Sequence, residues 1–188
     1  MIDYIRTYTG KKLHCANPQP EEICIEDIAH GLSAAPRWGG QCGLRYTVAA
    51  HSIYCYRMVP TLAMLLHDAS EAYFCDIPAP FKVLLPDYKK VENKIMTAIA
   101  TRFDFSWPLT ATEKAADAAA LYIERLLLFD FPNDGDVPSA SAPWPEWMFK
   151  TWSQYSEDTL EALFLSEFRS QERPADPVRF CAPSPFLT

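Results

Sequence analysis

Four ionisable side chains lie close together in one short stretch of the chain, "LLHDASEAYFCDIP". His67 and Asp68 are adjacent, Glu71 follows them, and Asp76 comes near the end. The preceding residues, "TLAMLL", are almost entirely apolar, which is typical of a buried helix. Burying a carboxylate beside an imidazole is costly unless each group finds a partner. A single divalent cation would satisfy both groups, so the stretch indicates a metal site.

Further ligands would have to come from neighbouring helices, because adjacent side chains on one helix diverge by about 100°. His51 lies in the middle of "VAAHSIYCY". Asp117 lies in "KAADAAALYIE", where an aspartate has poor helix propensity and no capping role. The alanines around Asp117 would let helices approach closely. His51, His67, Asp68 and Asp117 therefore form a candidate nitrogen and oxygen ligand set for Zn, Mn, Fe or Co.

Each of these residues also has an ordinary structural interpretation. A lone buried histidine is more often a hydrogen-bonded core residue than a ligand, and adjacent His-Asp pairs arise by chance. Glu71 lies four residues after His67 and three after Asp68, so the three are predicted to share one helical flank, which would ordinarily be a solvated face. Glu124 and Arg125 lie two turns after Asp117, and Glu124 shares its helical face; we expect both to be solvated or to lie between subunits.

The sequence as a whole predicts an all-α, single-domain helical bundle over residues 1–188. Thr47 and the sequence "TATE" (Thr110–Glu113) are predicted helix caps. Apolar periodicity and breaking residues place the helices at Ile23–Ser33, 48–59, Thr61 to about Cys75, Tyr88–Phe103, 111 to about Asp130, and Glu146–Arg169.

Turn-forming residues predict the segments between these helices. A short hairpin is expected around Thr9 and Gly10. The stretches "PRWGGQCGLRY" and "DIPAPFKVLLPD" are expected to be loops, because glycines or prolines interrupt them. Pro132–Pro145 is predicted to be a linker, and the tail from Pro174 to be extended or disordered.

The composition limits the class of partner. A net charge of −7 and a pI near 5.1 argue against a nucleic-acid-binding face, which needs a basic stripe. No apolar run approaches the roughly 20 residues that a membrane span needs. The opening "MIDYIRTYTGKK" has no apolar region of the kind found in signal peptides. None of the six cysteines forms a C-x-x-C pair, so we expect reduced thiols in a cytoplasmic protein.

His51, the adjacent pair His67-Asp68 and Asp117 match the H…HD…D pattern of the HD-domain metal-dependent phosphohydrolases. "RW" (Arg37-Trp38), "AHS", "LLHDASEAYFCDIPAPFK" and "AADAAALYIE" resemble the bacterial HD-domain 5′-deoxyribonucleotidases. The opening "RTYTGKK…NPQPEEICIEDIAHGLS" is still more similar to phage HD-domain enzymes that dephosphorylate deoxynucleoside triphosphates. Some of those enzymes deplete dATP in phages whose genomes carry 2-aminoadenine. The resemblance covers about residues 4–130.

The resemblance implies roles for individual residues of this chain. A catalytic divalent ion, Zn, Co or Mn with Mg as a further option, would be held by His51, His67, Asp68 and Asp117. Glu71 and Asp76 would serve the attacking water and the leaving group. Arg37 would contact phosphate, Trp38 would line the sugar or base pocket, and Lys82 would be a second phosphate contact.

The activity implied by the resemblance is attack at the α-phosphorus of a deoxynucleoside triphosphate. The products would be a deoxynucleoside and triphosphate, with dATP as the expected substrate and dADP or dAMP as further ones. The setting would be control of nucleotide pools by a phage in the host cytoplasm. Because related enzymes form dimers or hexamers, we expect a homo-oligomer.

Three other functions stay open at this level. The first is a 5′-deoxyribonucleotidase that acts on deoxynucleoside monophosphates. The second is a nucleotide-binding regulator that has lost turnover, although such a protein would have no need of Glu71 and Asp76. The third is a structural all-α protein with a coincidental His-Asp pair, which metal analysis would separate from the rest.

Overall fold

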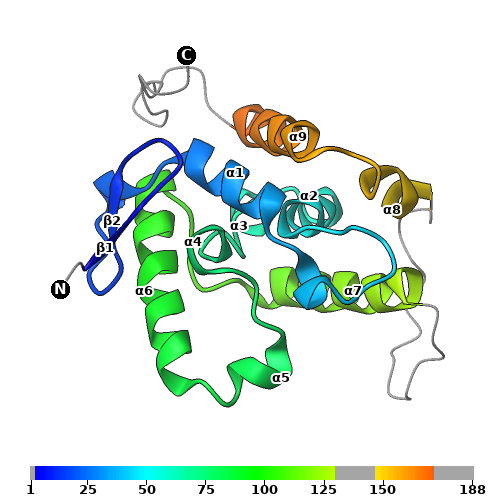
Figure 1. The fold of residues 1–188 in the computed structure, drawn as a ribbon, viewed down its shortest axis with the longest axis horizontal. Coiled ribbons are helices and arrows are strands. Elements are labelled where there is room, and N and C mark those ends of the chain that lie inside the picture. Colours follow the sequence, from blue (N-terminus) through cyan, green and yellow to red (C-terminus); the bar gives the residue numbers. More distant parts are fainter. Residues whose placement is uncertain (1–2, 130–146, 172–188) are drawn as a thin grey trace.

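Helices from the two halves of the chain pack around one shared hydrophobic core, and within the described residues the strands form one small hairpin (Figure 1). The computed structural model describes residues 3–129 and 147–171. The fold of this part is all-α, as the sequence predicts. Its elements are β1 (Tyr4–Arg6), β2 (Lys12–His14), α1 (Ile25–Ala34), α2 (Val48–Met58), α3 (Leu62–Leu65), α4 (Glu71–Phe74), α5 (Ala79–Lys82), α6 (Pro86–Phe103), α7 (Ala111–Leu128), α8 (Trp147–Trp152) and α9 (Glu157–Ser170), with short 3-10 turns at Pro20–Glu22 and Arg37–Gly40.

The predicted caps form as the sequence indicates. The Thr47 side chain accepts a hydrogen bond from the amide of Ala50 at the start of α2. Thr110 and Glu113 form the reciprocal capping box at the start of α7. The predicted hairpin is also present, since β1 and β2 pair antiparallel and Gly10 has a positive φ of 84° in the turn between them.

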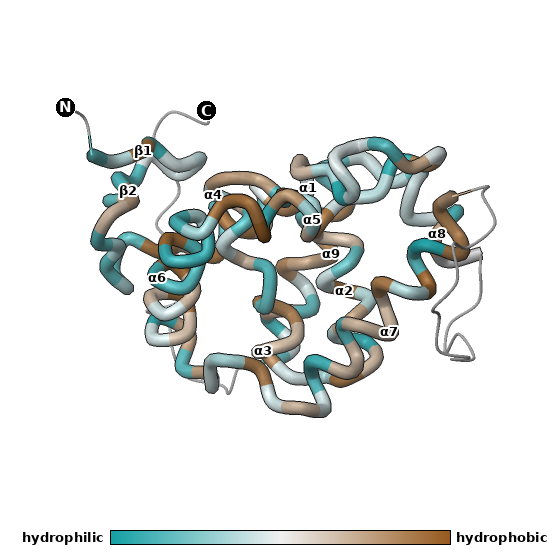
Figure 2. Tube along the Cα trace, turned by 90° about the horizontal axis from the view of Figure 1, so that it is seen from below, coloured by the Kyte–Doolittle hydropathy of each residue, from teal (hydrophilic) through white to brown (hydrophobic). Residues whose placement is uncertain are grey.

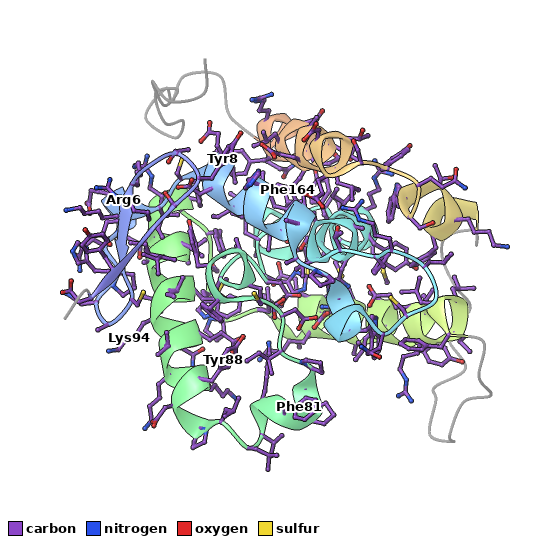
Figure 3. All side chains as sticks on the ribbon, in the orientation of Figure 1. Arg6, Tyr8, Phe81, Tyr88, Lys94 and Phe164 are labelled. Atoms are coloured by element: carbon purple, nitrogen blue, oxygen red, sulfur yellow. The ribbon has the colours of Figure 1, made fainter. Side chains whose placement is uncertain are left out.

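Helix α2 lies at the centre of the fold and contacts α1, α3, α7 and α9. Its residues from Val48 to Tyr56 are all buried, so the helix has no solvent face. Phe164 of α9 is fully buried in the same core, between α9 and α1 (Figure 3). This central position fixes the direction of every side chain on α2, including His51.

The predicted continuous helix from Thr61 to about Cys75 is wrong, because the chain forms α3, a turn, and then α4. The Nδ1 of His67 donates to the carbonyl of Met64 at 2.8 Å. In a continuing α-helix that carbonyl would accept from the amide of Asp68 instead. The histidine side chain therefore replaces a helical hydrogen bond, and His67 and Asp68 lie in the turn, not on a helical flank with Glu71.

A close approach between α1 and α4 fixes the second half of this motif. A Cβ at Gly31 would lie 2.5 Å from the carbonyl oxygen of Ala72, so only glycine fits there. Since Ala72 follows Glu71 in α4, the missing side chain at Gly31 determines how far Glu71 lies from α1.

Two other expectations about local structure need correction. The proline-rich stretch after Asp76 contains one helical turn, α5, because Pro80 lies in its first turn, where a missing amide costs nothing. The predicted helix Glu146–Arg169 is divided into α8 and α9, because Ser156 caps a new helix. The linker Pro132–Pro145 and the tail from Pro174 lie outside the described residues.

The surface and the cysteines add three observations. None of the helices in the described part combines the length and the apolar character of a bilayer-spanning helix. Cys15, Cys42, Cys55 and Cys75 carry free thiols, whereas Cys24 is disulfide-bonded, so the expectation of reduced thiols throughout is wrong at Cys24.

Residues Phe81, Val83, Leu84 and Leu85 are exposed, and the last three form a hydrophobic segment of the tube in Figure 2.

Candidate metal centre

Side chains from α2, the α3–α4 turn and α7 converge on one buried point. Ligand atoms of His51, Cys55, His67 and Asp117 lie within 4.8 Å of one another, and this buried cluster could hold a metal ion. Asp68 belongs to the same cluster, because its Oδ2 lies 3.3 Å from His67 Nε2 and 3.5 Å from His51 Nε2. All four predicted metal ligands are therefore brought together.

The hydrogen bonds of the two histidines determine which ring nitrogens face the centre of the cluster. His67 Nδ1 contacts a backbone carbonyl and His51 Nδ1 contacts the carboxylate of Glu124, and both partners can only accept. Each Nδ1 therefore carries a proton, and in a neutral ring each Nε2 carries a lone pair. The two Nε2 atoms face each other at 3.1 Å. Two lone pairs at this distance repel unless a cation lies between them.

The spacing of the donor atoms fits a shared divalent ion. Nitrogen and oxygen ligands bind zinc at about 2.0–2.2 Å, so neighbouring ligands of one tetrahedral ion lie about 3.3–3.6 Å apart. Asp117 Oδ1 lies 3.2 Å from His51 Nε2 and 3.6 Å from His67 Nε2. Cys55 Sγ lies 3.5 Å from His51 Nε2, so a thiolate is close enough to bind as well. The donor set thus offers nitrogen, carboxylate and sulfur, which suits a transition metal.

The charges of the cluster support the same conclusion. Burial on its own lowers the pKa of each histidine, but the neighbouring acidic groups raise both well above the usual range. Burial on its own raises the pKa of Asp68 and Asp117, but the histidines hold both far below their usual range. The carboxylates therefore stay ionised. Without a metal, neutralising the charges of these two carboxylates would require both histidines to be imidazolium ions, with their Nε2–H groups facing each other.

Glu124 and Arg37 form a second layer behind the ligands. Glu124 is fully buried and accepts from His51 Nδ1 and, at 3.2 Å, from Arg37 Nη2. Arg37 also donates from Nη1 to Asp68 at 3.3 Å. The expectation that Glu124 is solvated or intersubunit is wrong, because it orients a candidate ligand. Carboxylate–histidine–metal arrangements of this kind fix the tautomer of the histidine and raise its basicity.

A pocket with a volume of about 570 Å³ opens beside the cluster. Its lining includes the ligands Asp68 and Asp117 and, in addition, all five residues predicted for catalysis or substrate binding: Arg37, Trp38, Glu71, Asp76 and Lys82. Every predicted site residue therefore lies in the cluster or in the pocket.

Glu71 and Asp76, two acidic residues of the pocket, have raised pKa values. Burial raises the pKa of Glu71 to about 8, the charges of Asp68 and Asp76 add to this, and Lys82 opposes it. Burial also raises the pKa of Asp76, which Arg37 opposes. Lys82 Nζ donates to Glu71 Oε1 at 2.8 Å, whereas Glu71 Oε2 is buried without a hydrogen-bond partner in the described part. Glu71 is therefore suited to hold and transfer a proton.

The loop after α1 gives Trp38 an uncommon backbone conformation. Trp38 has φ 58°, which is rare for a residue with a side chain, and Gly39 and Gly40 also have positive φ. The indole ring packs edge-to-face on Phe129 at 5.2 Å between centroids. Backbone strain of this kind is often found at functional sites, so the conformation supports a role for Trp38 in the pocket.

Sequence reasoning missed two residues of the centre. Cys55 lies one helical turn after His51, so its spacing could have indicated a fourth residue on that face. Glu124 lies seven residues after Asp117, close to two turns, so its position on the same face was visible. Its burial was not visible, because that depends on how closely α7 packs against α2.

The comparisons with known proteins place the chain among relatives. No family model matches it. It is 39% identical over 127 residues to "Uncharacterized protein YfdR" of Escherichia coli (strain K12), which covers 66% of this chain and 71% of the relative. It is 34% identical over 128 residues to "Uncharacterized protein RCAP_rcc00048" of Rhodobacter capsulatus, which covers 61% of this chain and 65% of that relative. The chain therefore belongs to the family of the Escherichia coli protein YfdR.

Proposed function

We propose that the chain is a metal-dependent phosphohydrolase of the HD-domain type that acts on deoxynucleoside triphosphates, with dATP as the expected substrate. One observation carries the proposal: two histidine lone pairs and two ionised carboxylates converge at the wall of a pocket that also contains a protonatable glutamate. The H…HD…D residues that resemble HD-domain enzymes are the same residues that form this cluster.

The metal and the cations of the pocket have complementary tasks in this proposal. When bound, a divalent ion activates water and neutralises charge on the phosphoryl group. His51, His67, Asp68 and Asp117 would hold it. Arg37 is fixed by Asp68 and Glu124, and its Nε has no hydrogen-bond partner among the described residues, so it can still donate to a phosphate oxygen. Lys82, which also lines the pocket and donates to Glu71, supplies a second positive charge.

Glu71 and Asp76 would move the protons of the reaction. The oxygen of water forms the new bond to the α-phosphorus, and the P–O5′ bond breaks with its electrons on O5′. O5′ takes the proton held at Glu71 Oε2, and the carboxylate of Asp76 accepts the proton that water loses. The raised pKa of Glu71, about 8, keeps that proton in place near neutral pH.

The test is a panel of dNTPs, dNMPs and NTPs incubated with Co, Mn, Zn or Mg, with the products resolved by chromatography. Release of triphosphate from dNTPs is the expected result, and the chelator-treated protein serves as the blank. Activity confined to dNMPs would replace the proposal with a 5′-deoxyribonucleotidase. Binding of nucleotide without turnover under every metal would replace it with a regulator.

The proposal includes a homo-oligomer, dimer or hexamer, as the active form. The exposed apolar residues Phe81, Val83 and Leu84 support it, since monomers rarely expose such residues contiguously. Light scattering of the purified protein at several concentrations measures the mass. A monomer at all concentrations would contradict this part of the proposal alone.

A further inference from the structure

One arginine that lines the pocket, Arg125, has no role in the proposed reaction and is not part of the metal cluster. Arg37, Lys82 and Arg125 are the cations that line it. Arg37 is paired with Asp68 and Glu124, and Lys82 is paired with Glu71 and Glu92. Arg125 is exposed and has no ion pair within residues 3–129 and 147–171.

The position of Arg125 on α7 places it at a defined distance from the metal ligands. Asp117, Leu121 and Arg125 all line the pocket and are spaced four residues apart, so they follow one face of the helix. With a rise of 1.5 Å per residue, the Cα of Arg125 lies about 12 Å along the helix axis from that of Asp117. An anion that touches both ends of this face must therefore be elongated.

We propose that Arg125 binds the outer phosphates of a nucleoside triphosphate whose α-phosphorus lies at the metal cluster. This inference rests on the proposed function, and it names the part of the substrate that distinguishes a triphosphate from a monophosphate. A guanidinium forms bidentate hydrogen bonds with phosphate oxygens, and Arg125 has no carboxylate partner among the described residues that it would have to release first. A monophosphate at the cluster would be too short to reach it.

The charge of the pocket gives a second reason. Asp68, Glu71, Asp76 and Asp117 line the pocket beside its three cations. A triphosphate brings several further negative charges, and Arg37 and Lys82 are already balanced by carboxylates. An unpaired cation away from the metal is what such a substrate requires.

Two other roles for Arg125 predict different results. Arg125 lies in the last turn of α7, where a cation stabilises the helix dipole. It also lies one turn from Phe129, which contacts Trp38, so it could contact the nucleoside instead of the phosphates. The first role would change stability alone, and the second would affect mono- and triphosphates equally.

The first experiment measures binding without turnover. Inorganic tripolyphosphate and inorganic phosphate are titrated calorimetrically into wild-type protein, Arg125→Gln and Arg125→Lys. We expect tripolyphosphate to bind about tenfold more weakly to Arg125→Gln, which corresponds to the loss of one charge-assisted contact, with partial recovery in Arg125→Lys. Phosphate should bind all three alike. Equal tripolyphosphate affinities, or no binding to the wild type, would overturn the inference.

The second experiment compares substrates. Arg125→Gln should raise the KM for dNTPs about tenfold and leave the KM for dNMPs unchanged, with little effect on kcat. Lys12→Gln is the matched control, because it removes an exposed cation on the hairpin at the opposite end of the molecule (Figure 1). An equal rise for both substrates would overturn the inference in favour of a nucleoside contact.

The two experiments also separate this inference from the proposed function. If no nucleotide is hydrolysed but Arg125→Gln weakens tripolyphosphate binding, the triphosphate site stands and the proposed hydrolysis fails. If dNTPs are hydrolysed but Arg125→Gln changes neither tripolyphosphate affinity nor KM, the inference fails and the proposed function stands. Thermal unfolding of Arg125→Gln identifies a purely structural role, which would lower Tm without changing either affinity.

Discussion

The metal cluster and the pocket wall formed by α4 and α5 lie side by side but are built differently. In the cluster, His51 and His67 are fully or almost fully buried, and each has its second ring nitrogen fixed by a further hydrogen bond. In the wall, Glu71 accepts a hydrogen bond from Lys82, which it shares with Glu92, and the segment ends in Val83, which is 82% exposed.

This difference suits the cluster to binding an ion and the wall to transferring a proton. A histidine whose second ring nitrogen is already hydrogen-bonded loses little conformational entropy when the metal binds, so the cluster is preorganised for a cation. A carboxyl group that shares a lysine can exchange its partner for substrate or water without moving the backbone. Substitutions in the cluster should therefore change metal content, whereas substitutions in the wall should change turnover while the metal stays bound.

The largest effect is expected from removal of a ligand. His67→Ala and Asp68→Ala should each lose bound metal and activity together, with activity lower by about a thousandfold or more, since the ion supplies several kcal/mol to the transition state. Metal content by mass spectrometry and turnover are measured on the same samples. His14→Ala, a half-exposed histidine of the hairpin, is the control. Full metal content in both ligand variants would show that the cluster is structural.

A smaller loss, with the metal retained, is expected in the wall. Glu71→Gln should keep a normal metal content and lose about a hundredfold or more in turnover, because the proton held at Glu71 is no longer available. Glu92→Gln is the matched control, since Glu92 shares Lys82 but does not line the pocket. Full activity of Glu71→Gln would show that its assignment as the proton donor is wrong.

A substitution in the second layer of the cluster should weaken metal affinity without lowering turnover once the metal is bound. Glu124→Gln removes the carboxylate behind His51 and should weaken metal affinity by about 10–100-fold. Competition with a chromophoric chelator measures that affinity. When saturating metal is added, turnover should return to near the wild-type rate. A persistent loss of turnover at saturating metal would mean that Glu124 acts on substrate through Arg37.

The same contrast explains how much of the molecule could be predicted from the sequence. Helix caps are local, so Thr47 and the box at Thr110–Glu113 are readable from residue spacing alone. The break after Leu65 is not, because it depends on the His67 side chain taking the carbonyl of Met64. Apolar periodicity continues through that turn and conceals it.

The site likewise contains residues that the sequence identifies and one that depends on tertiary packing. Histidines are scarce in this chain, and the pattern of a mid-helix histidine, an adjacent His-Asp pair and a mid-helix aspartate identifies the four candidate ligands. Glu124 was expected to be solvated or to lie between subunits, because acidic residues are rarely fully buried. Only the packing of α7 on α2 brings Glu124 to His51.

The smallest effect is expected at Glu113, which joins two elements of the cluster without touching the metal. Its Oε2 accepts from the amide and hydroxyl of Thr110 at the start of α7, and its Oε1 accepts from Thr61, which caps α3. Glu113→Gln should lower the free energy of unfolding at pH 7 by about 1 kcal/mol. Metal content should be unchanged.

The pH dependence of this loss tests its cause. Burial on its own would raise the pKa of Glu113, but hydrogen bonds from Thr61 and Thr110 and the charge of His67 hold it below its usual range. Because the folded pKa lies below the unfolded one, the stabilisation is fully present above the unfolded pKa, about 4.3, and is lost as the pH falls through the folded pKa. The gap between wild type and Glu113→Gln should therefore close on acidification below pH ~4.

Chemical denaturation at several pH values measures this gap, and every other titrating group cancels because both proteins share it. Glu157→Gln in the first turn of α9 is the control: its side chain is 56% exposed, so only a few tenths of a kcal/mol are expected. If the gap at Glu113 widened on acidification, the carboxylate would be destabilising in the folded state. The contact between α3 and α7 would then depend on apolar packing alone, and the cluster would owe its geometry to α2.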